Sequence, residues 1–382
     1  MIKPKVYFES GAAYCAAGDN IEAIWQRMAA GQLNLSDLPC PAFDSWPHPQ
    51  VFLVEEPSAA WLKIDRKLLR TMEKQAKLAM YGATLALRDS SALAKEDKSR
   101  IGLYLGLPTV DEPVPPWPLM QTMHESGDLH FDSEVMHREI PAFFGLSTLN
   151  SNACAHISGT YGMTGSMGVY SPFADAGLQA AIEAALSIIN GENEMALVGG
   201  VSPKINPLLL LQYEHFGWIN DAARIPGEGA AFVILNSTSN AACRVFLGGY
   251  ARGFVDSAAE AETVQTAVLQ AALAMARISA NEVDWIFPCA LCATECGALQ
   301  TLTGSADLPL CSSADICGSL GPAGPVLNLL LAVHGMQHQK RLRFNQSGTA
   351  LTEERGALKH ALVTATGPEG QYVAVILSAE LP

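Results

Sequence analysis

Residues 161–200 constrain the fold of this chain more than any other segment. After a turn that contains two glycines, the mostly apolar residues 167–173 predict a buried strand. Residues 174–189 predict a helix rich in small residues, and residues 194–198 predict a second strand that two glycines close. This framework is typical of a corner that carries a nucleophile between a strand and a helix. The nucleophile itself, however, is missing from this segment.

The rest of the chain predicts a layered α/β fold. It has 382 residues, of which 49% are hydrophobic and 16% charged, so it can bury a large core. Predicted strands and helices alternate along its whole length. Each half contains a glycine turn before a helix, at residues 162–165 and 318–324. We therefore expect two related halves, residues 1–235 and residues 236–382.

Several further elements follow from local patterns. Asn20 is expected to cap a helix that Gly31 ends. A short strand at residues 5–8, a turn at residues 10–12 and a long amphipathic helix at residues 61–87 are predicted in the first half. Further predicted elements are strands at 101–105, 285–287, 363–365 and 372–377, a buried strand ending at residue 235, and helices at 258–278 and from the glycine turn to about 338.

The charge and the cysteine content limit which partners and which cellular compartment are expected. The formal net charge of −14 argues against nucleic acid and anionic membranes as partners. The longest apolar runs, residues 208–211 and 326–333, are too short to span a bilayer, so no membrane insertion is expected. Nine cysteines without an evident secretion signal indicate reduced thiols in the cytoplasm.

The order and spacing of several motifs resemble the β-ketoacyl synthases, condensing enzymes of the thiolase fold. These motifs are residues 11–13 and 18–20, residues 67–86, residues 141–165, Pro226-Gly227-Glu228-Gly229-Ala230 and Gly321-Pro322-Ala323-Gly324. The resemblance covers nearly the whole chain. It implies a thiolase-like layered αβαβα fold of two duplicated halves.

The departures from this family all concern catalytic groups. The family's nucleophilic cysteine corresponds to Ala174, whether counted forward or backward without gaps. Its two histidines, which stabilise the oxyanion and assist decarboxylation, correspond to Cys289 and to Gly318, or with one gap Ser319. The loop that gates the family's active site corresponds to residues 366–370. Loss of all these groups indicates a subunit that does no condensation itself.

The family includes such subunits, the chain-length factors. They pair with an active ketosynthase, and the cavity at the interface limits the length of the product. The resemblance implies this role here, with a catalytic ketosynthase as heterodimeric partner and no cofactor. Several features are similar to the partner subunits of aryl-polyene systems.

The resemblance also suggests where the partners meet. Phe143 and Phe144 match a family segment at the dimer interface beside the acyl tunnel, so they are candidate wall residues, with plain core aromatics as the alternative. The acyl carrier protein of such systems is acidic. The charge of −14 disfavours its docking on this chain, so we expect it to dock mainly on the partner subunit.

Two other functions stay open. The chain could be a thiol-dependent acyltransferase whose chemistry has moved to Cys289 or Cys154, or a purely structural scaffold subunit. The cysteines at 289, 292 and 296 are spaced like metal ligands but lack a matching second pair. Buried free thiols are therefore preferred, and no metal is expected.

Overall fold

The computed structural model describes residues 4–40, 46–88, 90–94, 97–109, 124–125, 140, 143–220, 224–239, 244–288, 292–305, 307–344 and 351–380. Within them, a nine-stranded mixed sheet runs through the molecule. Its strands, in spatial order, are β5 (Met167–Tyr170), β4 (Ile101–Gly106), β6 (Met195–Val201), β7 (Gly229–Asn236), β1 (Tyr7–Cys15), β8 (Val245–Phe254), β13 (Gln371–Ala379), β12 (His360–Thr366) and β9 (Trp285–Phe287).

The sheet repeats the same arrangement on both sides of its centre. Outward from β1 lie β7, β6 and β4, and outward from β8 lie β13, β12 and β9. On both sides the first two pairings are antiparallel and the third is parallel. β1 and β8 join the sides through the pair Tyr7 and Phe246. This confirms the predicted fold class of two duplicated halves, while the division at residues 235 and 236 stays a prediction.

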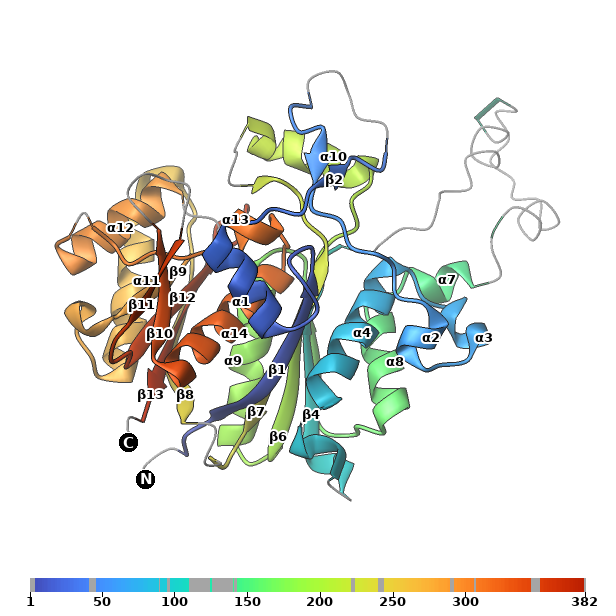
Figure 1. The fold of residues 1–382 in the computed structure, drawn as a ribbon, viewed down its shortest axis with the longest axis horizontal. Helices are drawn as coiled ribbons and strands as arrows, with labels where there is room; N and C mark the ends of the chain where they lie inside the picture. Colours follow the sequence, from blue (N-terminus) through green and yellow to red (C-terminus); the bar gives the residue numbers. More distant parts are fainter. Residues whose placement is uncertain are drawn as a thin grey trace.

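The two sides of the sheet form two layers of strands. Helices lie between these layers and on their outer faces, which gives five layers in all (Figure 1). The central layer, α9 (Asp175–Ile189) and α14 (Ala323–His338), contacts strands of both halves. α4 (Lys74–Arg88) and α8 (Asn152–Tyr161) cover the outer face of the first half, and α11 (Ala261–Ala276) and α12 (Ala293–Thr303) that of the second. The largest apolar core lies around the central helices, with a further core under each outer layer.

The remaining elements are short or lie outside these layers. They are α1 (Ile21–Ala30), β2 (Ser36–Asp37), β3 (Gln50–Val51), α2 (Ala59–Leu62), α3 (Arg66–Leu69), α7 (Phe144–Ser147), α10 (Pro207–His215), α13 (Ala314–Cys317), β10 (Lys340–Phe344) and β11 (Leu351–Arg355). Single 3-10 turns occupy Ser91–Ala94, Lys98–Arg100, Trp218–Asn220, Ala258–Glu260 and Ala280–Glu282. None of the helices in the described ranges has the length and apolar character needed to cross a bilayer.

The predicted bounds of α1 are confirmed, with Asn20 at its start and Gly31 at its end. Asn20 Oδ1 accepts a hydrogen bond from the Ala23 backbone N–H at 2.8 Å, which satisfies a free donor at the helix start. Gly31 ends the helix in the left-handed conformation, with φ of 61°.

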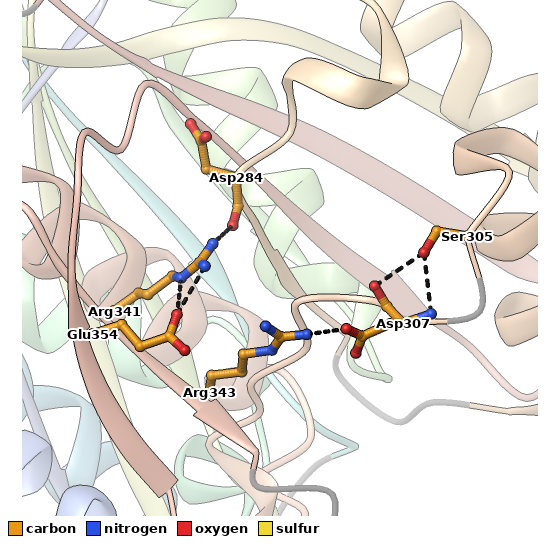
Figure 2. Close-up of polar contacts among 6 residues, drawn as sticks. All are labelled: Asp284, Ser305, Asp307, Arg341, Arg343 and Glu354. Carbon is orange, nitrogen blue, oxygen red and sulfur yellow. Dashed lines mark hydrogen bonds and ion pairs between the residues drawn. The ribbon is translucent and has the colours of Figure 1, made fainter.

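The hairpin of β10 and β11 is attached to the second half by charged side chains (Figure 2). Arg341 donates to the Asp284 carbonyl at 2.7 Å and to Glu354 Oε2 at 2.9 Å. Arg343 reaches Asp307 at 2.5 Å. These contacts fix the hairpin beside α14 without extending the main sheet.

The long helix predicted at residues 61–87 is wrong, because the structure has three helices there, α2, α3 and α4. Lys63 ends α2 in the left-handed conformation, with φ of 54°. Asp65 then caps α3 by accepting from the Lys67 backbone N–H at 2.8 Å. Local capping by a short acidic side chain outweighs the continuous helical pattern.

Two strand predictions also need correction. The turn predicted at residues 10–12 lies inside β1, where a Cβ on Gly11 would come within 2.2 Å of the Leu330 side chain of α14. The glycine there permits close packing rather than a turn. The strand at residues 167–173 is shorter than predicted, and it is not buried: Met167 is 43% exposed because β5 lies at the sheet edge.

Candidate functional site

Ala174 lies at the first turn of the central helix α9. Its backbone is already helical, with φ of −58° and ψ of −36°, and no side chain caps the helix start. The preceding strand β5 is fixed to β4 near this point, since the Leu107 N–H donates to the Tyr170 carbonyl at 2.8 Å. The corner between strand and helix therefore has the predicted form, with a methyl group at its apex.

Close backbone packing brings the start of α14 against the start of α9. A Cβ on Gly177 of α9 would lie 2.2 Å from the Pro322 carbonyl oxygen, and a Cβ on Gly200 of β6 would lie 2.3 Å from it. Glycine at both positions is thus required for the approach. As a result, the loop before α14 faces Ala174.

A small cavity of about 50 Å³ lies beside Ala174. It collects residues from segments that lie far apart in the sequence. Its lining is Pro108, Thr109, Pro172, Phe173, Ala174, Pro203, Leu209, Gln212, Tyr213, Trp218, Arg224, Ser319, Gly321, Pro322 and Thr366. Ala174, Ser319 and Thr366, for which the resemblance implies catalytic or gating positions, therefore line the same cavity.

The chemistry of this cavity is poor in catalytic groups. Its described lining contains no thiol, imidazole or amine. The guanidinium of Arg224 lies 4.5 Å from the centre of the Trp218 ring, a cation–π contact. The side chains can bind an apolar or hydrogen-bonding group, but they supply neither a nucleophile with its base nor an imidazole donor.

A histidine would not fit at Gly318. Its φ is 73°, and an added Cβ would lie 2.6 Å from both the Ile225 carbonyl oxygen and the Phe52 ring. The backbone here is arranged for glycine alone. The other predicted counterpart of a histidine, Cys289, lies outside the described residues.

A larger groove of about 510 Å³ adjoins the cavity. Both share Thr109, Phe173, Pro203, Leu209 and Gln212. On the outer side, α10 contributes Leu208 and Leu211, which are 48% and 51% exposed. The two hollows thus lie side by side, from the molecular surface to Ala174.

Two buried carboxyl groups near this region escaped the sequence analysis. Asp175 directly follows Ala174, and burial raises its pKa to about 6, with the charge of Glu369 acting in the same direction. Glu295 of α12 is fully buried, and burial raises its pKa to about 7. Its Oε1 accepts hydrogen bonds from Thr364 and from Tyr372. Both carboxyls lie within apolar cores that the local sequence does not reveal.

Cys154 has the character of a core thiol rather than a nucleophile. It is 7% exposed, its sulfur lies 3.9 Å from the Met167 sulfur, and burial raises its pKa. It does not line either hollow beside Ala174. Within the described ranges, no group of three or more histidine, cysteine or acidic residues is arranged to hold a metal ion.

Phe143 and Phe144 lie at the start of α7, away from the hollows beside Ala174. Phe143 is 47% exposed and Phe144 is partly buried. Neither aromatic ring is part of the chain's own core clusters. Their role at an interface stays a prediction.

Comparison with known proteins adds a family and several structural relatives. The family model described as "Beta-ketoacyl synthase, N-terminal domain" matches residues 10–241. A search of curated proteins finds no match.

Three solved structures share the fold. A β-ketoacyl synthase from Burkholderia phymatum has 18% identity and a TM-score of 0.77, with 99% of this chain and 100% of that chain covered. The ishigamide ketosynthase/chain length factor has 16% identity and a TM-score of 0.80, over 99% and 100% of the two chains. The oxazolomycin ketosynthase domain of Streptomyces albus has 15% identity and a TM-score of 0.81, over 99% and 75%.

Proposed function

Because this chain belongs to the β-ketoacyl synthase family, we propose that it is the non-catalytic, chain-length-limiting partner of an active β-ketoacyl synthase. In this proposal the pair works in the cytoplasm and elongates acyl chains of a polyketide or polyene, with aryl polyenes as one candidate product. One of the structural relatives is itself described as a ketosynthase/chain length factor.

The observation that carries the proposal is the cavity at Ala174. The fold keeps the strand, corner and central helix that would position a nucleophile, but the corner residue is alanine. The described lining of the small cavity offers no replacement thiol or imidazole, His215 lines only the adjoining groove, and Gly318 has no room for a side chain. Such a site can retain the shape of a condensing enzyme while the chemistry occurs on another subunit.

Exposed apolar side chains support pairing through the region of α7, α8 and β5. Of eleven large apolar side chains exposed in the described residues, four lie between residues 143 and 167: Phe143, Leu146, Leu149 and Met167. Among the described residues, β5 is the last strand of the sheet on this side, and none of them pairs with its outer edge. A partner chain that covers this edge and these side chains would bury the exposed apolar surface and pair the backbone groups of the edge strand.

Assembly and acylation together test the proposal. The chain should co-purify with an intact ketosynthase as a heterodimer whose interface is of the obligate size class, more than about 2,000 Å². Incubation with acyl-carrier-protein thioesters, followed by intact-mass measurement, should place acyl groups on the ketosynthase and none on this chain.

Contrary results would point to the alternatives. A stable acyl adduct on this chain would favour the thiol acyltransferase, with Cys289 the remaining candidate because Cys154 is buried with a raised pKa. Two separate species on a sizing column would remove the heterodimer. An intact pair whose product length ignores every interface substitution would leave only the structural scaffold.

A further inference from the structure

Two cysteines from opposite ends of the sequence meet in the central core. Cys15 is the last residue of β1, and Cys317 is the last residue of α13. Their sulfur atoms lie 3.3 Å apart, and both side chains are buried, at 4% and 0% exposed. Both thiols are free in this structure.

We propose that Cys15 and Cys317 form a reversible dithiol–disulfide pair that links the two halves of the molecule beside the Ala174 cavity. The function proposed above does not require this pair, and the pair does not depend on that function.

The geometry needs only a small change. A disulfide bond is about 2.05 Å long, so the sulfurs must approach by about 1.2 Å. Hydrogen bonds fix both backbones: Cys15 and Gly18 exchange two at 2.9 Å, and the Cys317 N–H donates to the Ser313 carbonyl at 2.9 Å. Rotation of the two side chains, rather than movement of the strand or helix, would supply the approach.

The two thiols differ in a way that suits the reaction. The contact with Cys317 is the main cause of a lowered Cys15 pKa, because the Cys317 S–H can donate to a Cys15 thiolate. The same contact and burial raise the pKa of Cys317. Cys15 is therefore the more readily ionised thiol, and Cys317 keeps its proton.

Hydrogen peroxide is the oxidant that fits a buried pair, since it is nearly as small as water. The Cys15 sulfur attacks one peroxide oxygen, the O–O bond breaks, and one water leaves with the thiol proton, which gives a sulfenic acid. The Cys317 sulfur then attacks the Cys15 sulfur, the S–O bond breaks, and the hydroxyl leaves with the Cys317 proton as a second water. Two thiols and one peroxide thus give one disulfide and two waters.

The bond would act on one wall of the cavity. Cys317 directly precedes Gly318 and Ser319, and Ser319 lines the cavity. The Ser319 N–H donates to the Ile225 carbonyl at 2.7 Å, and the Gly227 N–H donates to the Ser319 carbonyl at 3.0 Å. A covalent tie from β1 to Cys317 would hold this bonded loop against the first half. Because it closes a very long loop of chain, it should also disfavour the unfolded state.

The test uses the full-length protein treated with hydrogen peroxide or with dithiothreitol. Non-reducing digestion and mass spectrometry should find the peptides of Cys15 and Cys317 joined, with the loss of two hydrogens, in the oxidised sample alone. The thermal unfolding midpoint should rise on oxidation and return on reduction. Cys15→Ser and Cys317→Ser should each abolish both changes.

Cys311→Ser is the matched control, because Cys311 is another buried thiol of this region, and burial raises its pKa. This variant should still form the bond. Peptides in which Cys15 and Cys317 stay reduced, or become oxidised singly, while the partly exposed thiol of Cys40 is oxidised would overturn the proposal. A bond that forms without any rise in the unfolding midpoint would overturn the link between the halves. Mapping of the wild-type chain decides the first point even where a variant fails to fold.

Discussion

At the residue scale, Ala174 occupies a position with the electrostatic properties of a nucleophile site. Ala174 makes no side-chain cap at the start of α9, and the helix dipole favours negative charge at this end. A thiol placed here would have a lowered pKa, although the carboxylate of Asp175 would oppose this when ionised. The missing thiol at residue 174 and the lack of an imidazole in the described cavity lining therefore both separate this site from a reactive one.

Ala174→Cys should turn this position into a reactive thiol. The cavity leaves room for a thiol, and the helix start stabilises a thiolate. We expect peptide mapping after iodoacetamide or acyl-thioester treatment to show modification at position 174 of the variant. Ala176→Cys is the matched control, since Ala176 lies on the same helix but is 1% exposed and lines no hollow. Equal modification of both variants, or of neither, would contradict an accessible cavity at Ala174.

Glu295→Gln should flatten the dependence of stability on pH. Burial raises the pKa of Glu295 to about 7 in the folded chain, against an ordinary value of 4.5. Between these values the folded state keeps a proton that the unfolded state has lost, so stability is present below about pH 4.5 and is lost as pH rises to about 7. The loss amounts to at most about 3 kcal/mol. Gln keeps the acceptor for Thr364 and Tyr372 without a charge.

Urea unfolding from about pH 4 to about pH 8 measures how the free energy of unfolding depends on pH. This range brackets the ordinary and the folded-state pKa values of Glu295. The variant should gain stability relative to wild type as pH rises. Glu214→Gln, at an exposed position of α10, is the control and should follow the wild-type curve. A variant with an unchanged slope would show that Glu295 does not hold the proton.

At the scale of elements, apolar side chains at β5 and α7 are exposed. The sheet ends at β5, and Met167 there contacts Cys154 of α8, so strand edge and helix layer are physically connected. α7 precedes α8 in the sequence, and Phe143 and Leu146 at this helix are exposed. An edge strand with apolar neighbours is a common docking surface, and in isolation it favours aggregation.

Phe143→Ala and Phe144→Ala, made separately, should affect the pair more than the chain. Phe143 is 47% exposed, so its truncation should change the stability of the isolated chain by less than about 0.5 kcal/mol. In the reconstituted pair it should weaken assembly, or, where the pair survives, release space for longer products. Sizing chromatography and product mass spectrometry give the two readouts.

Phe254→Ala is the matched control, because Phe254 is 59% exposed on β8 in the second half. It should change neither assembly nor product length. If Phe143→Ala and Phe144→Ala both leave the complex and the product distribution unchanged, neither ring lies in the tunnel, and the scaffold alternative gains support.

At the scale of the whole molecule, the charge distribution bears on the proposed docking of an acidic carrier protein. The chain has 24 basic and 38 acidic residues. Its basic side chains are not spread evenly: Lys63, Arg66, Lys67 and Arg70 lie exposed on α3 and its flanks, next to a hollow of about 840 Å³. Global repulsion and this local cluster act in opposite directions.

We expect repulsion by the net negative charge to outweigh attraction by the basic cluster at α3, so that the carrier docks mainly on the partner subunit. Arg66→Glu with Arg70→Glu should then leave the elongation rate of the pair unchanged within about twofold at low salt. Equivalent charge reversals on the ketosynthase subunit should slow it. A large rise in the carrier concentration needed for half-maximal rate with the α3 variant would instead assign docking to α3.

The sequence by itself determined the features that depend on neighbours along the chain. Asn20 and Gly31 bound α1 because capping needs only residues within one turn. The start of α9 at Ala174, the buried strand β7 and the pair β12 and β13 follow from short apolar patterns and glycine turns. That residue 174 is alanine can be seen in the sequence, but that a nucleophile belongs there is what the family resemblance implies and stays a prediction.

Only the tertiary structure decided what depends on distant segments. Ser319 and Thr366 meet Ala174 because two glycines let α14 approach α9, and no local pattern encodes that approach. Burial by other segments raises the pKa values of Asp175 and Glu295. The contact of Cys15 with Cys317 spans 302 positions of sequence. Such properties arise from the packing of layers, because burial and sulfur–sulfur distance are set by three-dimensional neighbours rather than by the order of residues.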